Sequence, residues 1–219
     1  MDELVNLLPL LWKSSYETLF IVGLSLLFGG IGGLLIGLGL YTTRQGSILQ
    51  NRAVFSILNV LVNVFRPIPF IIFLAAAQPL ARVVVGTGIG NNAIIFTLSL
   101  AAAFGISRIV EQNLLTVQPG VIEAARSVGA GPLRIIFTVL IPEALGPLIL
   151  GYTFIFVALV DMSAVAGYVG GGGLGNFAIQ YGYRLFNPAV TWAAVLIIIV
   201  LVQLVQWLGN TLARKALRR

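Results

Sequence analysis

The sequence predicts an all-α membrane protein in which five transmembrane helices and one helix–turn–helix elbow form a single domain, residues 1–219. Three observations lead to this fold class. Of the 219 residues, 58% are hydrophobic and 9% are charged, whereas a soluble domain carries about 25% charged residues. The mean hydropathy is +1.02, and uncharged runs of about 20 residues, enough to cross a bilayer, recur along the chain. Between two such runs lies a polar segment, residues 119–142, which contains helix-starting and helix-breaking residues.

The charge balance and the missing residue types exclude several classes of function. The net charge is +6, but the basic residues lie in short loops and in the tail, where the positive-inside rule explains them without a nucleic-acid partner. The chain contains no cysteine and no histidine, which excludes disulfides, Cys/His metal sites and histidine catalysis. We therefore expect no metal. The first residues lack a basic n-region, so no cleavable signal peptide is expected.

The first predicted span, residues 18–43, carries small residues on one face. Ser25, Gly29, Gly33 and Gly37 follow one another at steps of four, and such stripes let the backbone of a second helix approach closely. The pattern does not indicate which helix that is.

The second predicted span, residues 53–77, is interrupted by the run Arg66-Pro67-Ile68-Pro69. A charge within a span usually faces protein or water, and prolines free backbone groups that neighbours must satisfy. One interpretation is a kinked helix that lines a gate. The alternative is that Arg66 lies near the cytoplasmic interface and that the true span starts later.

The remaining predicted spans are residues 91–110, 144–165 and 188–208. Arg108 and Glu111 lie about one turn apart at the end of the third, so we expect them to pair. Asp161 is the lone acid of the fourth. The run after it satisfies G-x-G-x-x-G, but it follows no strand, so we expect flexible turns and no dinucleotide site. A phosphate-binding G-x-x-x-x-G-K-[ST] loop is absent from the sequence, so the chain is not expected to bind ATP.

The segment 119–142 predicts two short helices joined by a sharp turn. Pro119 is suited to the first helical position, and Val121, Ala125 and Val128 form an apolar stripe at helical spacing. Gly129-Ala130-Gly131 ends this helix, and Pro132 can start the next. Pro142 is expected to limit or kink the second helix.

The same segment resembles the coupling loop of ABC importer permeases of type I. That family has Glu-Ala-Ala, three residues, Gly, nine residues and Ile-x-Leu-Pro, and this sequence has the corresponding residues Glu123, Ala124, Ala125, Gly129 and Pro142. Conservative replacements stand at Val139 and Ile141. The five-span plan, the run FRPIPFIIF and the run GGGGLGNFAIQYGY are similar to those of bacterial methionine importer permeases.

This resemblance implies a permease subunit of an ATP-driven importer for methionine, in the L and D forms, with no enzymatic activity or bound cofactor of its own. It implies a homodimer that stands on two copies of a cytoplasmic ABC ATPase, which holds ATP and Mg²⁺, and that receives solute from an extracytoplasmic substrate-binding protein. The alternatives are a permease for another small amino acid or amino-acid derivative, and a secondary transporter, which would need coupling ions and internal repeats.

The resemblance also assigns roles within the elbow. Glu123 would supply a charge-assisted contact or a cap, Ala124 and Ala125 would allow close approach of the ATPase, and Gly129 would permit the turn. Arg126 would contact the ATPase or, alternatively, face lipid headgroups as a solvated cation. Pro142 closes the motif.

A translocation path is predicted from a set of polar, aromatic and thioether side chains that suit a zwitterionic amino acid. Its candidate residues are Arg66, Asp161, Met162, Tyr181 and Tyr183. For Asp161 the alternative is a pair with Arg66 or Arg108 across a dimer, or a place at the outer interface.

The distribution of basic residues predicts orientation in the bacterial plasma (inner) membrane. One side carries the loop with Arg44 and Arg52, the elbow, and a tail with four basic residues, whereas the other side carries Lys13, Arg82 and Arg184. By the positive-inside rule the elbow and the C-terminus are cytoplasmic and the N-terminus is outside.

Overall fold

The computed structural model describes residues 2–217, without the side chains of residues 2–5 and 168, and every regular element in that range is helical. The elements are α1 Asp2–Thr43, α2 Arg52–Phe65, α3 Phe70–Val85, α4 Asn91–Leu115, α5 Pro119–Ser127, α6 Pro132–Ile135, the π-helical η1 Ile136–Leu140, α7 Ile141–Tyr168, α8 Leu174–Phe177, the π-helical η2 Ala178–Tyr183, and α9 Pro188–Leu217.

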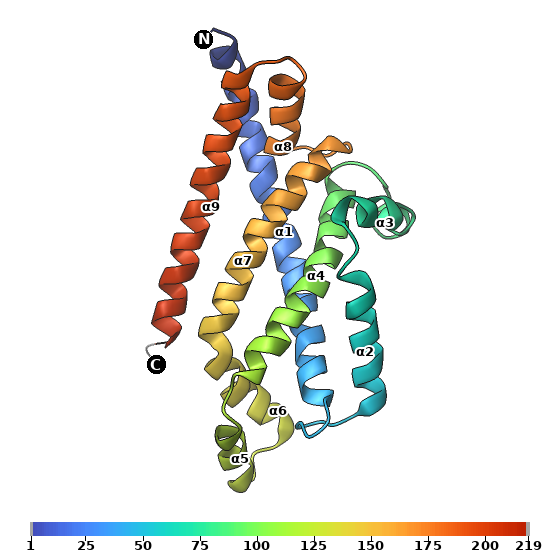
Figure 1. Ribbon diagram of the computed structural model, residues 1–219, viewed down its shortest axis with the longest axis vertical. Helices are drawn as coiled ribbons and strands as arrows, with labels where there is room; N and C mark the ends of the chain where they lie inside the picture. The colour runs from blue at the N-terminus through green and yellow to red at the C-terminus, as the bar shows by residue number, and fades with distance from the viewer. Residues whose placement is uncertain (1, 218–219) are drawn as a thin grey trace.

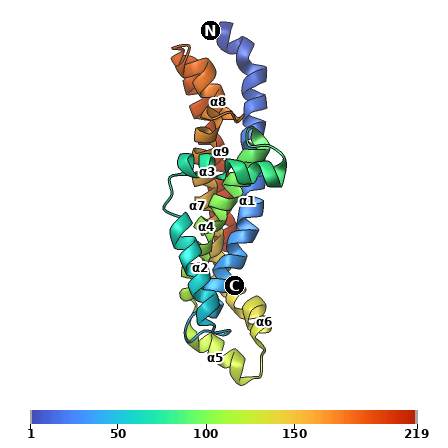
Figure 2. The same ribbon diagram turned by 90° about the vertical axis from the view of Figure 1, so that its right-hand side faces the viewer.

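The long helices α1, α4, α7 and α9 run along the long axis, and the chain ends lie toward opposite ends of it (Figure 1). Figure 2 shows the short helices α5 and α6 at the lower end and α3 lying across the bundle. In the described residues, four helices are long and apolar enough to cross a membrane, and the bent pair α2–α3 would provide a fifth crossing. The predicted all-α fold is confirmed.

The small-residue stripe of α1 packs against α4. A Cβ atom added at Gly29 would lie 2.5 Å from the Cβ of Ala102, and one at Gly33 would lie 2.6 Å from the Cβ of Ile106. The hydroxyl of Ser25 donates to the backbone carbonyl of Ile95 at 3.4 Å. The predicted close helix approach is therefore confirmed, and the structure identifies α4 as the partner.

The second predicted span is broken rather than continuous. α2 ends at Phe65, and α3 begins at Phe70 after a bend of 116°. Pro67 and Pro69 explain the break, because neither can donate a backbone hydrogen bond. Arg66 follows the 14 residues of α2, which at 1.5 Å per residue places it about 20 Å from the loop that precedes this helix. This position favours the interpretation of a kinked helix over the alternative in which Arg66 lies near the cytoplasmic interface.

The helix of the fourth predicted span starts earlier than expected. A helical run continues from Pro132 through η1 and α7 to Tyr168, so Pro142 does not end it. Since Pro142 lacks an N–H, the ladder is interrupted there, and the π-helical segment η1 ends two residues before it, at Leu140. The helical run that contains the predicted span 144–165 therefore begins about three turns before residue 144.

The glycine-rich turn after α7 is fastened to two other helices. Gly170 and Gly173 have φ of 100° and 92°, values that favour glycine. The backbone N–H of Gly172 donates to the side chain of Asn91 at 2.9 Å, and that of Leu174 donates to Thr18 at 2.8 Å. The expectation of merely flexible turns is thus corrected, since α1 and α4 supply acceptors that the local sequence does not reveal.

Candidate coupling elbow and translocation cleft

The predicted helix–turn–helix elbow is present. α5 has Pro119 at its start, and its end is closed by two backbone bonds, from Gly129 N–H to the Arg126 carbonyl at 2.9 Å and from Ala130 N–H to the Ala125 carbonyl at 3.1 Å. Gly129 has φ of 80°, so the turn uses the left-handed conformation typical of helix C-termini. Gly131 is extended and Pro132 starts α6.

The face of α5 that packs on the bundle differs from the predicted stripe. Ile122 and Ala125, three residues apart, pack against the hydrophobic core. Val121 and Val128 are exposed, the latter at 83%. Val128 follows the last residue of α5 as its C-cap, so it leaves the face on which Ala125 lies. Together with Leu133 and Phe137, which are also exposed, these valines leave an apolar surface on the elbow.

The charged residues of the elbow also point outward. Glu123, Ala124 and Arg126 are exposed, as is Pro142. Within the described residues the side chains of Glu123 and Arg126 make no hydrogen bond or ion pair. With Arg44 they border a hollow of about 340 Å³ between α5 and the loop after α1. The elbow thus offers charged and apolar groups to a partner at the lower end of the molecule.

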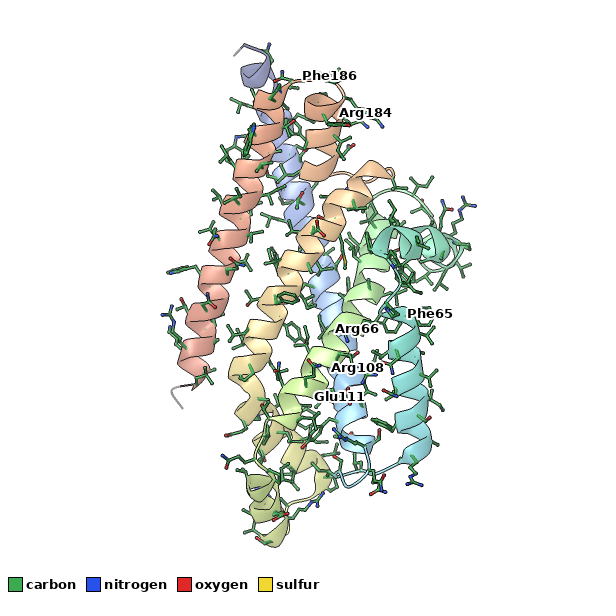
Figure 3. The ribbon with its side chains drawn as sticks, viewed as in Figure 1. Phe65, Arg66, Arg108, Glu111, Arg184 and Phe186 are labelled. Carbon is green, nitrogen blue, oxygen red and sulfur yellow. The ribbon has the colours of Figure 1, made fainter. Side chains whose placement is uncertain are left out.

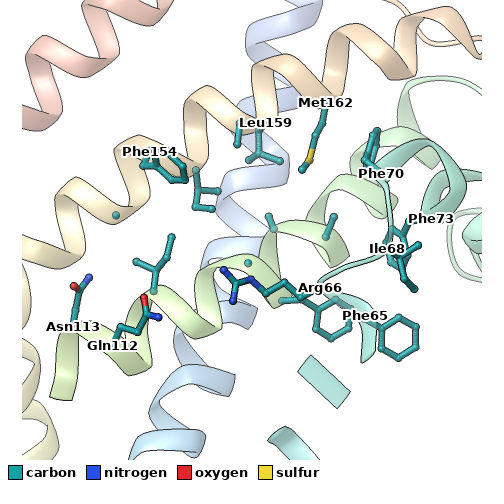
Figure 4. Close-up of a pocket in the computed structure, with 18 of the residues that line it drawn as sticks. Phe65, Arg66, Ile68, Phe70, Phe73, Gln112, Asn113, Phe154, Leu159 and Met162 are labelled. Atoms are coloured by element: carbon teal, nitrogen blue, oxygen red, sulfur yellow. The ribbon is translucent and has the colours of Figure 1, made fainter. Parts of the chain in front are cut away.

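A larger cleft of about 700 Å³ opens between the α2–α3 break, α4 and α7 (Figure 4). Its wall is mainly apolar and aromatic, and it includes Phe65, Phe73 and Phe154. The polar lining consists of Arg66 and the amides Gln112 and Asn113, and Arg66 is the sole ionisable side chain among the described lining residues.

Beside this cleft, Arg108 joins α4 to α2 (Figure 3). Its guanidinium lies 2.5 Å from the carboxylate of Glu111, and it also donates to the side-chain oxygens of Asn59 at 2.5 Å and Asn63 at 2.7 Å. The side chains of Arg108 and Glu111 are only 13% and 9% exposed. The predicted pair is confirmed. The two asparagines were missed, although their spacing of four residues places them on one face of α2.

The predicted translocation residues do not form one cluster. Arg66 and Met162 line the same cleft, whereas Asp161 is exposed beside Met162 and does not line it. The ring of Tyr181 packs on Phe177, with centroids 5.5 Å apart, and Tyr183 is 75% exposed. The reason is that α8 and η2 turn away from the cleft and pack against α9 and the start of α1.

The side chain of Asp161 has no hydrogen bond or ion pair in the described part of the chain. Arg108, one of its suggested partners, is already paired with Glu111. The side chain of Arg66 makes no ion pair with any described residue, so Arg66 remains the second suggested partner of Asp161.

Residues 29–218 match the family described as "Binding-protein-dependent transport system inner membrane component". The chain is 39% identical over 206 residues to the probable D-methionine transport system permease protein MetI of Vibrio cholerae, covering 94% of this chain and 92% of the relative. It is 43% identical over 200 residues to the methionine import system permease protein MetP of Bacillus subtilis, covering 91% and 90%.

Chains of two solved ABC transporter structures have the same fold as this chain. A chain of the MetNI methionine ABC transporter in inward-facing conformations superposes with a TM-score of 0.93, at 41% identity, covering 96% of this chain and 98% of that chain. A chain of an amino acid ABC transporter with histidines superposes with a TM-score of 0.79, covering 97% of both chains. At 22% identity this second likeness concerns the fold alone.

Proposed function

Since the chain belongs to the family of binding-protein-dependent transport system inner membrane components, we propose that it is the permease subunit of an ATP-driven methionine importer. The observation that carries the proposal is the end-to-end similarity to methionine permeases, at 39% and 43% identity over more than 90% of this chain. The likeness to the methionine ABC transporter structure supports the same assignment.

The proposed assembly is a homodimer of this chain on two copies of a cytoplasmic ABC ATPase, with a substrate-binding protein on the outer side. ATP and Mg²⁺ bind to the ATPase. The membrane is the bacterial inner membrane, with the elbow and C-terminus inside and the N-terminus outside. Figure 1 supports this orientation, because the elbow and the loop after α1 share the lower end, where Arg44, Arg52 and Arg126 lie.

The proposed coupling site is the elbow, formed by Glu123, Ala124, Ala125, Arg126 and Gly129, with Pro142 at the helix that follows. Ile122 and Ala125 hold α5 against the core. From Pro132 one helical run leads to Met162 in the cleft wall. A displacement of the elbow by the ATPase therefore moves a wall of the cleft. Only contacts that differ between two states can drive such a change.

The test is reconstitution of the permease with its ATPase and binding protein into proteoliposomes. We expect uptake of L- and D-methionine that requires ATP and stops when the phosphate-loop lysine of the ATPase is replaced. Uptake of another amino acid in place of methionine would reject the substrate assignment. Uptake that persists without the ATPase would instead identify a secondary transporter.

A further inference from the structure

Arg66 is a cation without a partner in the wall of the cleft. Its backbone N–H donates to the Val62 carbonyl at 3.0 Å, but its guanidinium makes no hydrogen bond, ion pair or ring contact with any described residue. Arg108, which lies nearby on α4, is paired with Glu111 and two asparagines. Arg66 is exposed, so its guanidinium is accessible from the cleft. An ionisable residue within a membrane-spanning segment is a candidate functional group, and this unpaired cation is available to an anion from outside the chain.

The backbone at the α2–α3 break presents the guanidinium to the cleft. Because α2 ends at Phe65, Arg66 projects from a helix end, whose partial negative charge attracts a cation. In Figure 4 the guanidinium extends from the break toward the side of the cleft that carries Gln112. No carboxylate lies among the described residues of the lining, so the only formal charge there is positive.

The other lining groups suit the rest of a small amino acid. The amides of Gln112 and Asn113 make no side-chain hydrogen bond within residues 6–217, and their oxygens are acceptors for an ammonium group. Met162 and Phe154 offer a thioether and an aromatic face to an apolar side chain that contains sulfur. The cleft volume of about 700 Å³ lies within the range of small-molecule sites.

We propose that the guanidinium of Arg66 binds the α-carboxylate of the transported amino acid within the cleft, with the solute side chain toward Met162. The proposal rests on the function proposed above and adds a site to it. A guanidinium and a carboxylate can form a bidentate pair with two parallel hydrogen bonds, which fixes the orientation of the solute as well as its position.

The test uses the absence of native cysteines. The variant Ala158→Cys places a thiol in the lining of the cleft, in the assembled permease–ATPase complex. We expect millimolar methionine to slow the reaction of this thiol with a small maleimide, whereas methioninamide, which lacks the carboxylate, should not. Adding Arg66→Gln should raise the methionine concentration for half protection at least about tenfold, as expected for loss of a charge-assisted bond.

Arg82→Gln is the matched control, because Arg82 is an exposed cation on α3 outside the cleft lining. Equal protection by methionine and methioninamide, or unchanged protection with Arg66→Gln, would overturn the proposal. The comparison of the two ligands needs no change at Arg66, so it decides the matter even if Arg66→Gln fails to assemble. If methionine gives no protection while the same complex imports it, the site is wrong and the proposed function stands.

Discussion

The carboxylate of Glu17 on α1 accepts a hydrogen bond from the backbone N–H of Gly173 at 3.0 Å, although 156 residues separate them. With Thr18, which accepts from Leu174 N–H, it satisfies donors at the start of α8. These bonds connect the first helix to the turn between α7 and α9. They hold the turn in the conformation that the positive φ of Gly173 requires.

We therefore expect Glu17→Ala to loosen this turn locally. Loss of the acceptor leaves a part-buried N–H unpaired, which costs about 1–3 kcal/mol. Hydrogen exchange at Gly173 and Leu174 should accelerate by a factor of about 5 to 150. Lys13→Ala is the control, because it keeps the carboxylate of Glu17. It removes only the ion pair between that carboxylate and the Lys13 side chain, which is 69% exposed and 3.9 Å away. Unchanged exchange in Glu17→Ala would show that the bond does not hold the turn.

The second prediction concerns the buried pair on α4. Glu111→Gln leaves the Arg108 charge without its counter-ion, so we expect the free energy of unfolding in detergent to fall by about 3–5 kcal/mol. Glu143→Gln, at an exposed acid, should change it by less than about 0.5 kcal/mol. The double variant Arg108→Gln/Glu111→Gln should recover part of the loss. Equal stabilities of Glu111→Gln and Glu143→Gln would contradict this role.

The third prediction compares two glycines of α1. Gly33→Ala brings a methyl group to 2.6 Å from the Cβ of Ile106, and overpacking of this kind costs about 1–3 kcal/mol. At Gly23 no atom lies within 4 Å, so Gly23→Ala should be neutral or stabilising by about 0.5–1 kcal/mol. Thermal unfolding of the two purified variants tests the difference. Similar melting temperatures of the two variants would mean that α1 and α4 do not pack closely at Gly33.

The fourth prediction concerns coupling through the elbow. Gly129→Val places a β-branched residue at φ of 80°, and Gly131→Val places one in an extended conformation at φ of −71°. Neither site is crowded, so the difference is backbone strain at Gly129. We expect Gly129→Val to insert normally but to lose ATP-driven uptake, whereas Gly131→Val keeps it. Full uptake by Gly129→Val would separate the turn conformation from coupling.

The fifth prediction concerns orientation. Since the native chain lacks cysteine, Ser47→Cys, in the loop between α1 and α2, and Leu185→Cys, in the turn before α9, can be labelled singly in intact cells and in inverted vesicles. Leu185 is 66% exposed. We expect an impermeant thiol reagent to reach Leu185→Cys only from outside and Ser47→Cys only from the cytoplasm. The reverse pattern would reject the proposed docking of a cytoplasmic ATPase.

Local sequence patterns predicted those features that depend on neighbouring residues. Pro119, Gly129 and Pro132 fixed the helix, turn and helix of the elbow, because proline and glycine restrict the backbone wherever they stand. Arg108 and Glu111 could be paired from their spacing on a single helix. The boundaries of the helices were predicted less accurately. The helix continues through Pro142, because the backbone hydrogen bonds before it take the π-helical pattern over Ile136–Leu140.

By itself, the sequence determined that the chain is an all-helical membrane protein with a polar elbow, because hydropathy, charge distribution and turn residues act locally. Only the tertiary structure decided which groups come together from different helices. Arg66 and Met162 line one cleft, Asn59 binds Arg108, and Glu17 binds Gly173. It also placed Tyr181 against Phe177 and away from that cleft. The physical reason is that helix periodicity gives the face on which a residue lies, whereas its partner depends on the packing angle and register of another helix.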